Sequence, residues 1–201
     1  MKFLNKTLLV SILVFSSIMT SLMGGSVTKY IPIISDDFIT FLPQKTGYEP
    51  PLNSLEHTTI VTTNGKKIRV DRTPEGLVFE GYIGKIVLLE VYGHSCPHCQ
   101  RAIPHYNTLK KRYPKDVYVI TIESYGLTNT ELKQYVKSQH IAYDTVSKNN
   151  SGKMLSFIRT LIKRTPPGVP YLVILSQSGD FIEYKFLPEF DYIDGQIKAL
   201  L

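Results

Sequence analysis

Residues 86–99 read IVLLEVYGHSCPHC and contain the only two cysteines of the chain. The first seven of these residues are apolar except for Glu90, a pattern typical of a central strand buried on both faces. Cys96 and Cys99 follow closely, separated by a Pro-His dipeptide. A bridge that closes so short a loop adds little stability. The pattern therefore indicates a redox dithiol rather than a structural disulfide.

The residues that follow Cys96 predict a helix from Pro97 to Tyr113. Apolar side chains recur there at helical spacing, and proline suits a first-turn position. A cysteine at the start of a helix meets unpaired backbone N–H groups and the positive end of the helix dipole, which favour its thiolate. Pro104 lies inside the predicted helix and is expected to kink it.

Apolar runs and helical patterns alternate along the rest of the domain, which predicts an α/β fold with a central mixed sheet and helices on both faces. A β-hairpin is expected to open the domain at 58–70, because Asn64-Gly65 is a strong turn signal. The further predicted strands are 116–122, 142–146, 171–175 and 181–187, and the further predicted helices are 128–139, 152–163 and 192–201.

The N-terminal residues predict export. Lys2 and Lys6 precede an uncharged, mostly apolar segment, so we expect residues 1–27 to be a signal peptide or a membrane anchor. Residues 28–56 contain several prolines and no sustained periodicity, which predicts a linker, and 57–201 are then the domain. The expected location is periplasmic or otherwise extracytoplasmic, with residues 7–27 as the anchor in the inner membrane if they are not cleaved.

Composition narrows the classes of partner. The chain has 201 residues, of which 43% are hydrophobic, enough for the core of a single domain. The net charge of +6 falls to +4 when Lys2 and Lys6 are excluded. The densest basic cluster, residues 110–115, is interpreted as a solvated helix face. We therefore expect no nucleic-acid partner, and no motif predicts a cofactor.

Together these features resemble the thioredoxin fold, and specifically the exported TlpA-like family, over about residues 57–201. The dithiol follows a strand and opens a helix, and Glu90 lies six residues before Cys96. Pro104, eight residues after Cys96, resembles the kinking proline of the family. Far downstream, Gly168-Val169-Pro170 resembles the cis-proline loop that lies opposite the dithiol.

The length of the domain resembles TlpA-like proteins, whereas the residues around the dithiol resemble DsbA. Between Cys99 and Pro170 there is room for a helical insertion beyond a minimal thioredoxin core, as in TlpA-like proteins. By contrast, the Pro97-His98 centre and Val169 before the expected cis-proline resemble DsbA, an oxidant.

The activity implied by this resemblance is thiol-disulfide exchange with proteins. Cys96 would be the exposed nucleophile, and Cys99 would resolve the mixed disulfide. Burial is expected to raise the pKa of Glu90, which suits it to accept and return the proton of Cys99, although a satisfied core carboxylate is the alternative. The backbone of Val169, exposed by a cis bond to Pro170, would pair with a bound peptide.

The direction of exchange depends on the residues that tune the dithiol, Pro97 and His98. His98 can stabilise the Cys96 thiolate and make the disulfide more oxidising, which favours a disulfide donor. The plainer interpretation is an exposed helix-start residue, and a TlpA-type reductant, for example in cytochrome c maturation, is the alternative function. A membrane or periplasmic redox protein is the expected electron partner.

Other residues near the motif have simpler interpretations. His94 and His105 are expected to be surface or packing residues, although His94 could tune substrate approach, and Tyr92 is expected in the aromatic core. Two thiolates can hold Zn²⁺ or Cu⁺, but the sequence has no second ligand pair with regular spacing. A metal-binding module, or an interaction domain with an incidental dithiol, is therefore the weaker alternative, and we expect no metal.

Overall fold

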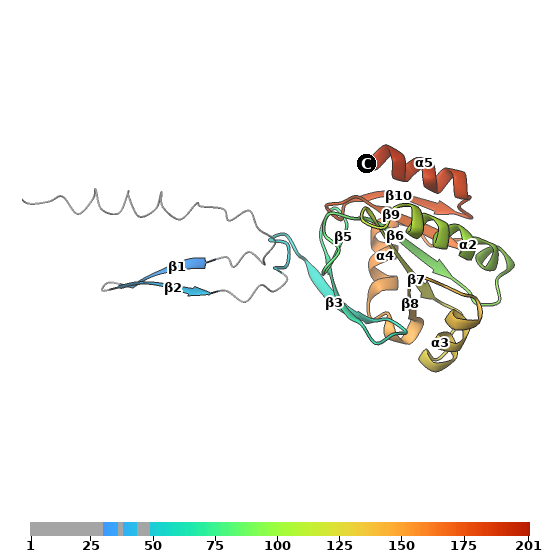
Figure 1. Ribbon diagram of the computed structural model, residues 1–201, viewed down its shortest axis with the longest axis horizontal. Coiled ribbons are helices and arrows are strands. Elements are labelled where there is room, and N and C mark those ends of the chain that lie inside the picture. Colours follow the sequence, from blue (N-terminus) through green and yellow to red (C-terminus); the bar gives the residue numbers. More distant parts are fainter. Residues whose placement is uncertain (1–29, 36–37, 44–48) are drawn as a thin grey trace, which may run out of the picture. The chain divides into compact units, whose positions relative to one another are not determined.

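The computed structural model describes residues 30–35, 38–43 and 49–201 (Figure 1). The chain divides into two compact units, Met1–Gly47 and Tyr48–Leu201. The predicted signal peptide or anchor at 1–27 lies outside the described residues. Within the described ranges, no helix is both long enough and apolar enough to cross a membrane.

The first unit contains an antiparallel pair of strands, β1 (Tyr30–Ser35) and β2 (Phe38–Pro43). The sequence analysis predicted a linker over 28–56 and did not predict these two strands. Both consist mainly of apolar and β-branched residues, which favour strands. Pro32 and Pro43 obscured that signal, but proline is tolerated at sheet edges, and both strands of a two-stranded sheet are edges.

The second unit is built on a five-stranded mixed sheet with the order β10-β9-β6-β7-β8. The central strand β6 (Ile86–Tyr92) pairs parallel with β7 (Val117–Glu123) and antiparallel with β9 (Tyr171–Leu175). Strand β8 (Asp144–Ser147) extends the parallel part, and β10 (Phe181–Phe186) pairs antiparallel with β9. Every residue of β6, β7 and β9 is buried, as expected for central strands covered on both faces.

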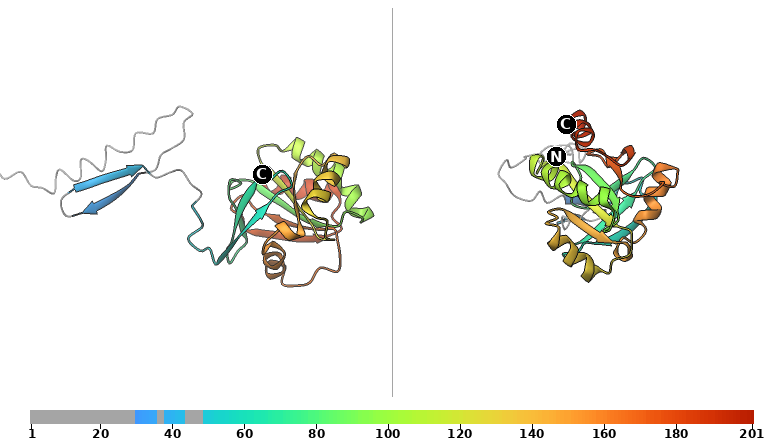
Figure 2. Two further views of the ribbon diagram at one scale, coloured as in Figure 1. Left: turned by 90° about the horizontal axis from the view of Figure 1, so that it is seen from below. Right: turned by 90° about the vertical axis from the view of Figure 1, so that its right-hand side faces the viewer.

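Helices lie on both faces of this sheet (Figures 1 and 2). Helices α2 (Pro97–Arg112) and α5 (Phe190–Leu200) pack on the face that carries Ile86 and Leu88. Helix α4 (Met154–Ile162) packs on the opposite face. Because side chains alternate along a strand, Glu90 shares the face that α2 covers. The strand register therefore directs this carboxyl group toward the helix that carries the dithiol.

A three-stranded antiparallel sheet joins α4 on its face of the domain. It consists of β3 (Glu56–Val61), β4 (Lys67–Arg72) and β5 (Leu77–Phe79). The predicted hairpin at 58–70 is confirmed, and Gly65 in its turn has φ 86°. Strand β5 was not predicted, since three residues are too few to show an alternating pattern.

The predicted fold class is confirmed, including the helix α4 inserted before β9. Helix α3 (Asn129–Ser138) begins at the predicted capping box. There Thr128 Oγ1 accepts from the backbone N–H of Glu131 at 3.3 Å, and the Glu131 carboxylate accepts from the backbone N–H of Thr128 at 2.9 Å. Leu132 of this helix packs beside the two cysteines.

Candidate active site

The two cysteines lie at the start of α2 as free thiols. Cys96 is the N-cap residue, and its Sγ accepts a hydrogen bond from the backbone N–H of Cys99 at 3.4 Å. The sequence analysis predicted an exposed nucleophile, and this was wrong, because Cys96 is only 8% exposed and Cys99 2%. Both pack in one cluster with Tyr92 and Leu132, with Val169 against it. Tyr92 is a core residue, as expected.

A loop far along the chain lies against Cys96. The Val169–Pro170 peptide bond is cis, as predicted. The carbonyl oxygen of Val169 lies 3.6 Å from Cys96 Sγ, which donates to it. Tertiary packing thus brings together groups that are 73 residues apart in the sequence.

Glu90 lies beneath the dithiol on β6 and is 2% exposed. Burial raises its pKa well above the usual value, negative charge on Cys96 adds to the shift, and the neighbouring Tyr106 hydroxyl opposes it. Within the described part of the chain, its Oε1 has no hydrogen-bond partner. Its interaction with Cys96 and Cys99 places this carboxyl group where a proton acceptor for the dithiol would lie.

Cys99 is the thiol that is coupled to this carboxyl group. Burial raises the pKa of Cys99, and its contact with Cys96 raises it further. The backbone of Gly93 lowers this pKa, and the negative charge of Glu90 adds a smaller rise. Cys99 therefore holds its proton tightly. Its reaction as a nucleophile requires a base, and Glu90 is close enough to interact with it electrostatically.

His98 is exposed and turned toward its own helix. Its Nδ1 lies 2.9 Å from Nη2 of Arg101. A guanidinium group only donates, so Nδ1 accepts and Nε2 carries the ring proton in the neutral form. The contacts of the described residues include none between His98 and Cys96, which the sequence analysis had expected. Pro97 occupies the first position of α2, as expected.

A groove of about 540 Å³ lies between α2 and the residues that lead into α5, and His98 and Pro170 line it. Arg101 and His105 line one side, and Glu189 and Asp191 contribute to the other. Of these lining residues, Pro170 directly follows Val169, the residue that contacts Cys96. His105 also packs against the ring of Phe190, with ring centroids 5.5 Å apart.

Comparison with known proteins agrees with this geometry. Residues 84–181 match the sequence model of a family described as Thioredoxin-like. The exposed lipoprotein thioredoxin Etrx1 of Streptococcus pneumoniae has a similar structure, with a TM-score of 0.55 at 20% identity over 72% of this chain and 100% of the other. The domain has a thioredoxin-like fold.

Further structures resemble this thioredoxin-like domain. A secreted Mycobacterium tuberculosis disulfide oxidoreductase, described as homologous to E. coli DsbE, has a TM-score of 0.52 at 17% identity, over 71% of this chain and 96% of the other. A thiol-disulfide oxidoreductase from Bacteroides fragilis has a TM-score of 0.53 at 17% identity, over 74% and 99%. No curated protein matches the sequence.

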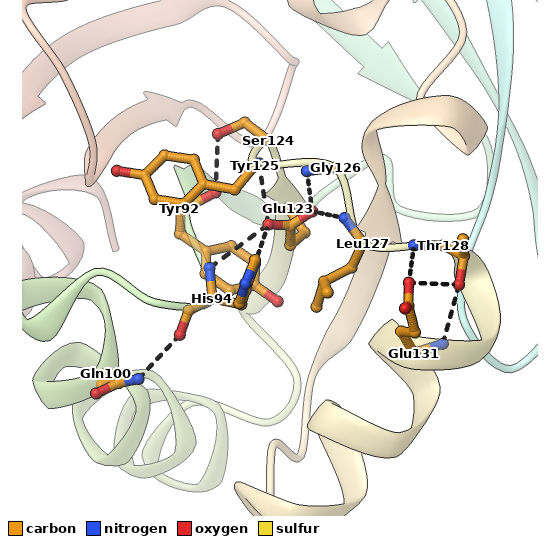
Figure 3. Close-up of polar contacts among 10 residues, drawn as sticks. All are labelled: Tyr92, His94, Gln100, Glu123, Ser124, Tyr125, Gly126, Leu127, Thr128 and Glu131. Carbon is orange, nitrogen blue, oxygen red and sulfur yellow. Dashed lines mark hydrogen bonds and ion pairs between the residues drawn. The ribbon is translucent and has the colours of Figure 1, made fainter.

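The sequence analysis missed Glu123, the last residue of β7. Its buried carboxylate lies 2.9 Å from Nδ1 of His94, two residues before Cys96 (Figure 3). The sequence did contain a signal for Glu123, because it directly follows the predicted strand 116–122, the next strand after β6 in the chain. Neighbouring parallel strands end at the same edge of a sheet, and Glu123 is in register with Tyr92 at the end of β6. Glu123 is therefore positioned beside the residues that lead into the thioredoxin-like dithiol.

The metal-binding alternative needs further ligands beside the two cysteines. Within residues 49–201 and the two described strands before them, no group of three or more His, Cys, Asp or Glu side chains could hold a metal ion.

Proposed function

We propose that this chain is an extracytoplasmic thiol-disulfide oxidoreductase that exchanges disulfides with protein thiols through Cys96 and Cys99. The observation that carries the proposal is the position of Cys96, which caps α2 and contacts the carbonyl of Val169. The next residue, Pro170, lines the groove. The thioredoxin-like fold supports it. The apolar segment at 7–27, together with the lipoprotein and secreted proteins among the similar structures, supports the location.

The reaction follows from the two thiols and the buried carboxyl group. In the oxidised protein, a substrate thiolate attacks Cys96 Sγ, the Cys96–Cys99 bond breaks, and the electron pair goes to the Cys99 sulfur. That sulfur takes a proton from Glu90. Burial keeps Glu90 protonated and gives the Cys99 sulfur a high affinity for a proton. In the opposite direction, Glu90 accepts the proton of Cys99 as Cys99 attacks the mixed disulfide.

The groove is the proposed place for the substrate chain beside the reacting cysteine. Pro170 lines it, and the adjacent Val169 contacts Cys96, so an extended peptide in the groove can pair with the Val169 backbone. Basic and acidic side chains line opposite parts of it, so a substrate segment with both charges fits best.

The contacts of two residues favour the reductant as the direction of exchange, whereas the sequence pattern favoured an oxidant. His98 is paired with Arg101 rather than with Cys96. The Val169 carbonyl beside Cys96 Sγ is an acceptor and offers no stabilisation to a thiolate. Less stabilisation of the reduced thiolate makes a dithiol a stronger reductant. A membrane or periplasmic redox partner that resets the dithiol is part of this proposal.

The reduction potential of the full-length protein distinguishes the two directions. We expect a value closer to about −270 mV, the thioredoxin end of the range, than to about −120 mV, the DsbA end. We also expect His98→Ala to change it by less than about 30 mV, which corresponds to about 1.4 kcal/mol. A potential near the DsbA end that falls strongly in His98→Ala would show that His98 drives an oxidant.

Trapping the mixed disulfide tests the activity itself. Reduced full-length Cys99→Ser is incubated with an oxidised protein such as scrambled ribonuclease. We expect a covalent complex through Cys96 that dithiothreitol releases, since the variant lacks the thiol that resolves it. The double variant Cys96→Ser/Cys99→Ser is the matched control. Absence of the complex, or an equal yield from the control, would contradict the proposal.

A further inference from the structure

Glu123 is a fully buried carboxylate at the end of β7, next to the dithiol loop. Its two oxygens accept hydrogen bonds from three consecutive backbone N–H groups, those of Tyr125 at 2.9 Å and of Gly126 and Leu127 at 3.0 Å (Figure 3). A carboxylate has only acceptor sites, and these donors fix its orientation. The side chain is therefore held rigidly with one oxygen toward His94.

His94 is oriented by this carboxylate. Nδ1 of His94 lies 2.9 Å from Oε1 of Glu123, so Nδ1 carries the proton and donates it. In the neutral ring, Nε2 is then the unprotonated nitrogen, free to accept a proton. The backbone carbonyl of His94 also accepts from the side-chain amide of Gln100 on α2 at 2.9 Å, which ties this loop to the active-site helix.

The His94 backbone lies in the turn that leads into Cys96. The backbone N–H of Cys96 donates to the Gly93 carbonyl at 3.1 Å, which closes a turn with His94 inside it. The His94 side chain is 33% exposed, and its ring lies edge-on to the rings of Tyr125 and Tyr135, with centroids 6.0 and 6.3 Å away. Tyr135 lies near enough to Cys99 and Cys96 to interact with both thiols electrostatically, so its contact with the partly exposed imidazole places His94 near the dithiol.

The other acid–base groups near the dithiol are occupied or buried. Nδ1 of His98 accepts from Arg101, and Glu90 lies beneath the cysteines rather than at the surface. Glu131 at the start of α3 is near enough to sense the charge of His94, but its carboxylate bonds to its own helix cap. His94 is therefore the imidazole near the dithiol whose orientation a buried carboxylate fixes.

We propose that His94, positioned by Glu123, is the acid–base group that takes the proton of the substrate cysteine as that cysteine attacks Cys96. The proton moves from the substrate thiol to Nε2 while its sulfur forms a bond to Cys96 Sγ. The Cys96–Cys99 bond breaks, and the electron pair leaves on the Cys99 sulfur. The substrate sulfur is oxidised and the protein disulfide reduced. In the reverse direction the imidazolium returns the proton to the departing substrate sulfur.

This inference rests on the proposed function, and its test separates the two. The oxidised full-length protein is reacted with two thiols at pH 7. One is glutathione, which is mostly protonated there, and the other is 5-thio-2-nitrobenzoate, an aromatic thiol that is already ionised. Only glutathione has to lose a proton to a base before or during its attack on Cys96. We expect His94→Gln to slow the glutathione reaction about 100-fold and to leave the aromatic thiolate reaction within about twofold.

Matched variants complete the test. His57→Gln removes an exposed histidine from β3 and should change neither rate. Glu123→Gln places an amide against the backbone donors and should reduce the glutathione rate selectively, because His94 loses its fixed orientation. Equal slowing of both thiols in His94→Gln, or no slowing of either, would overturn the role of His94. Reaction of the unsubstituted protein with neither thiol would instead overturn the proposed oxidoreductase.

Discussion

Replacing Cys96 with serine should abolish disulfide exchange and leave the domain folded. A hydroxyl group forms no disulfide, so we expect the rate with any disulfide or dithiol substrate to fall at least about 1000-fold. The folded state should not suffer, because serine is a preferred N-cap residue. Its Oγ can accept the backbone N–H of Cys99 that Cys96 Sγ accepts now. Exchange kinetics and urea unfolding of the reduced proteins measure both effects.

The control for this prediction is Cys99→Ser, which keeps the attacking sulfur. It should retain the first attack on a disulfide and lose only the resolving step. If Cys96→Ser exchanged disulfides at the original rate, the dithiol would be incidental, and an interaction domain would explain the chain better. Unfolding of Cys96→Ser at a urea concentration well below that of the original protein would show that the cap contact does not carry over to serine.

Replacing Glu90 with glutamine should stabilise the protein at neutral pH and slow resolution. Between the usual carboxyl pKa of 4.5 and the raised pKa of buried Glu90, the folded protein binds a proton that the unfolded chain has lost. Stability therefore falls as the pH rises through that window. Glutamine does not titrate. Within the window, the free energy of unfolding of the variant therefore rises relative to that of the original protein by about 1.4 kcal/mol for each pH unit.

The kinetic effect of the same substitution has a different origin. Glutamine cannot accept the proton of Cys99, so we expect the resolving step to slow about 100-fold while the first attack by Cys96 is unchanged. Single-turnover exchange and urea unfolding at pH 5 and pH 8 measure the two effects. Glu75→Gln, which neutralises an exposed carboxylate, should show neither. An unchanged resolving step in Glu90→Gln would remove Glu90 from the mechanism.

Much of the fold follows from local sequence patterns. The buried strand before the dithiol, the helix from Pro97 and the capping box at Thr128 depend on periodicity and on residues within a few positions of one another. The two strands of the first unit did not follow from these patterns. Strands β1 and β2 contain prolines that suggest a linker, yet as edge strands they tolerate them.

The sequence by itself determined the chemistry of the site: the dithiol at a helix start, a carboxylate in a buried strand, and a proline loop downstream. Tertiary structure alone decided the contacts. It buried Cys96, turned His98 toward Arg101, and joined Glu123 to His94 across 29 residues. The physical reason is that residue type sets what a side chain can donate or accept, whereas its partner depends on segments that meet only when the sheet and helices pack.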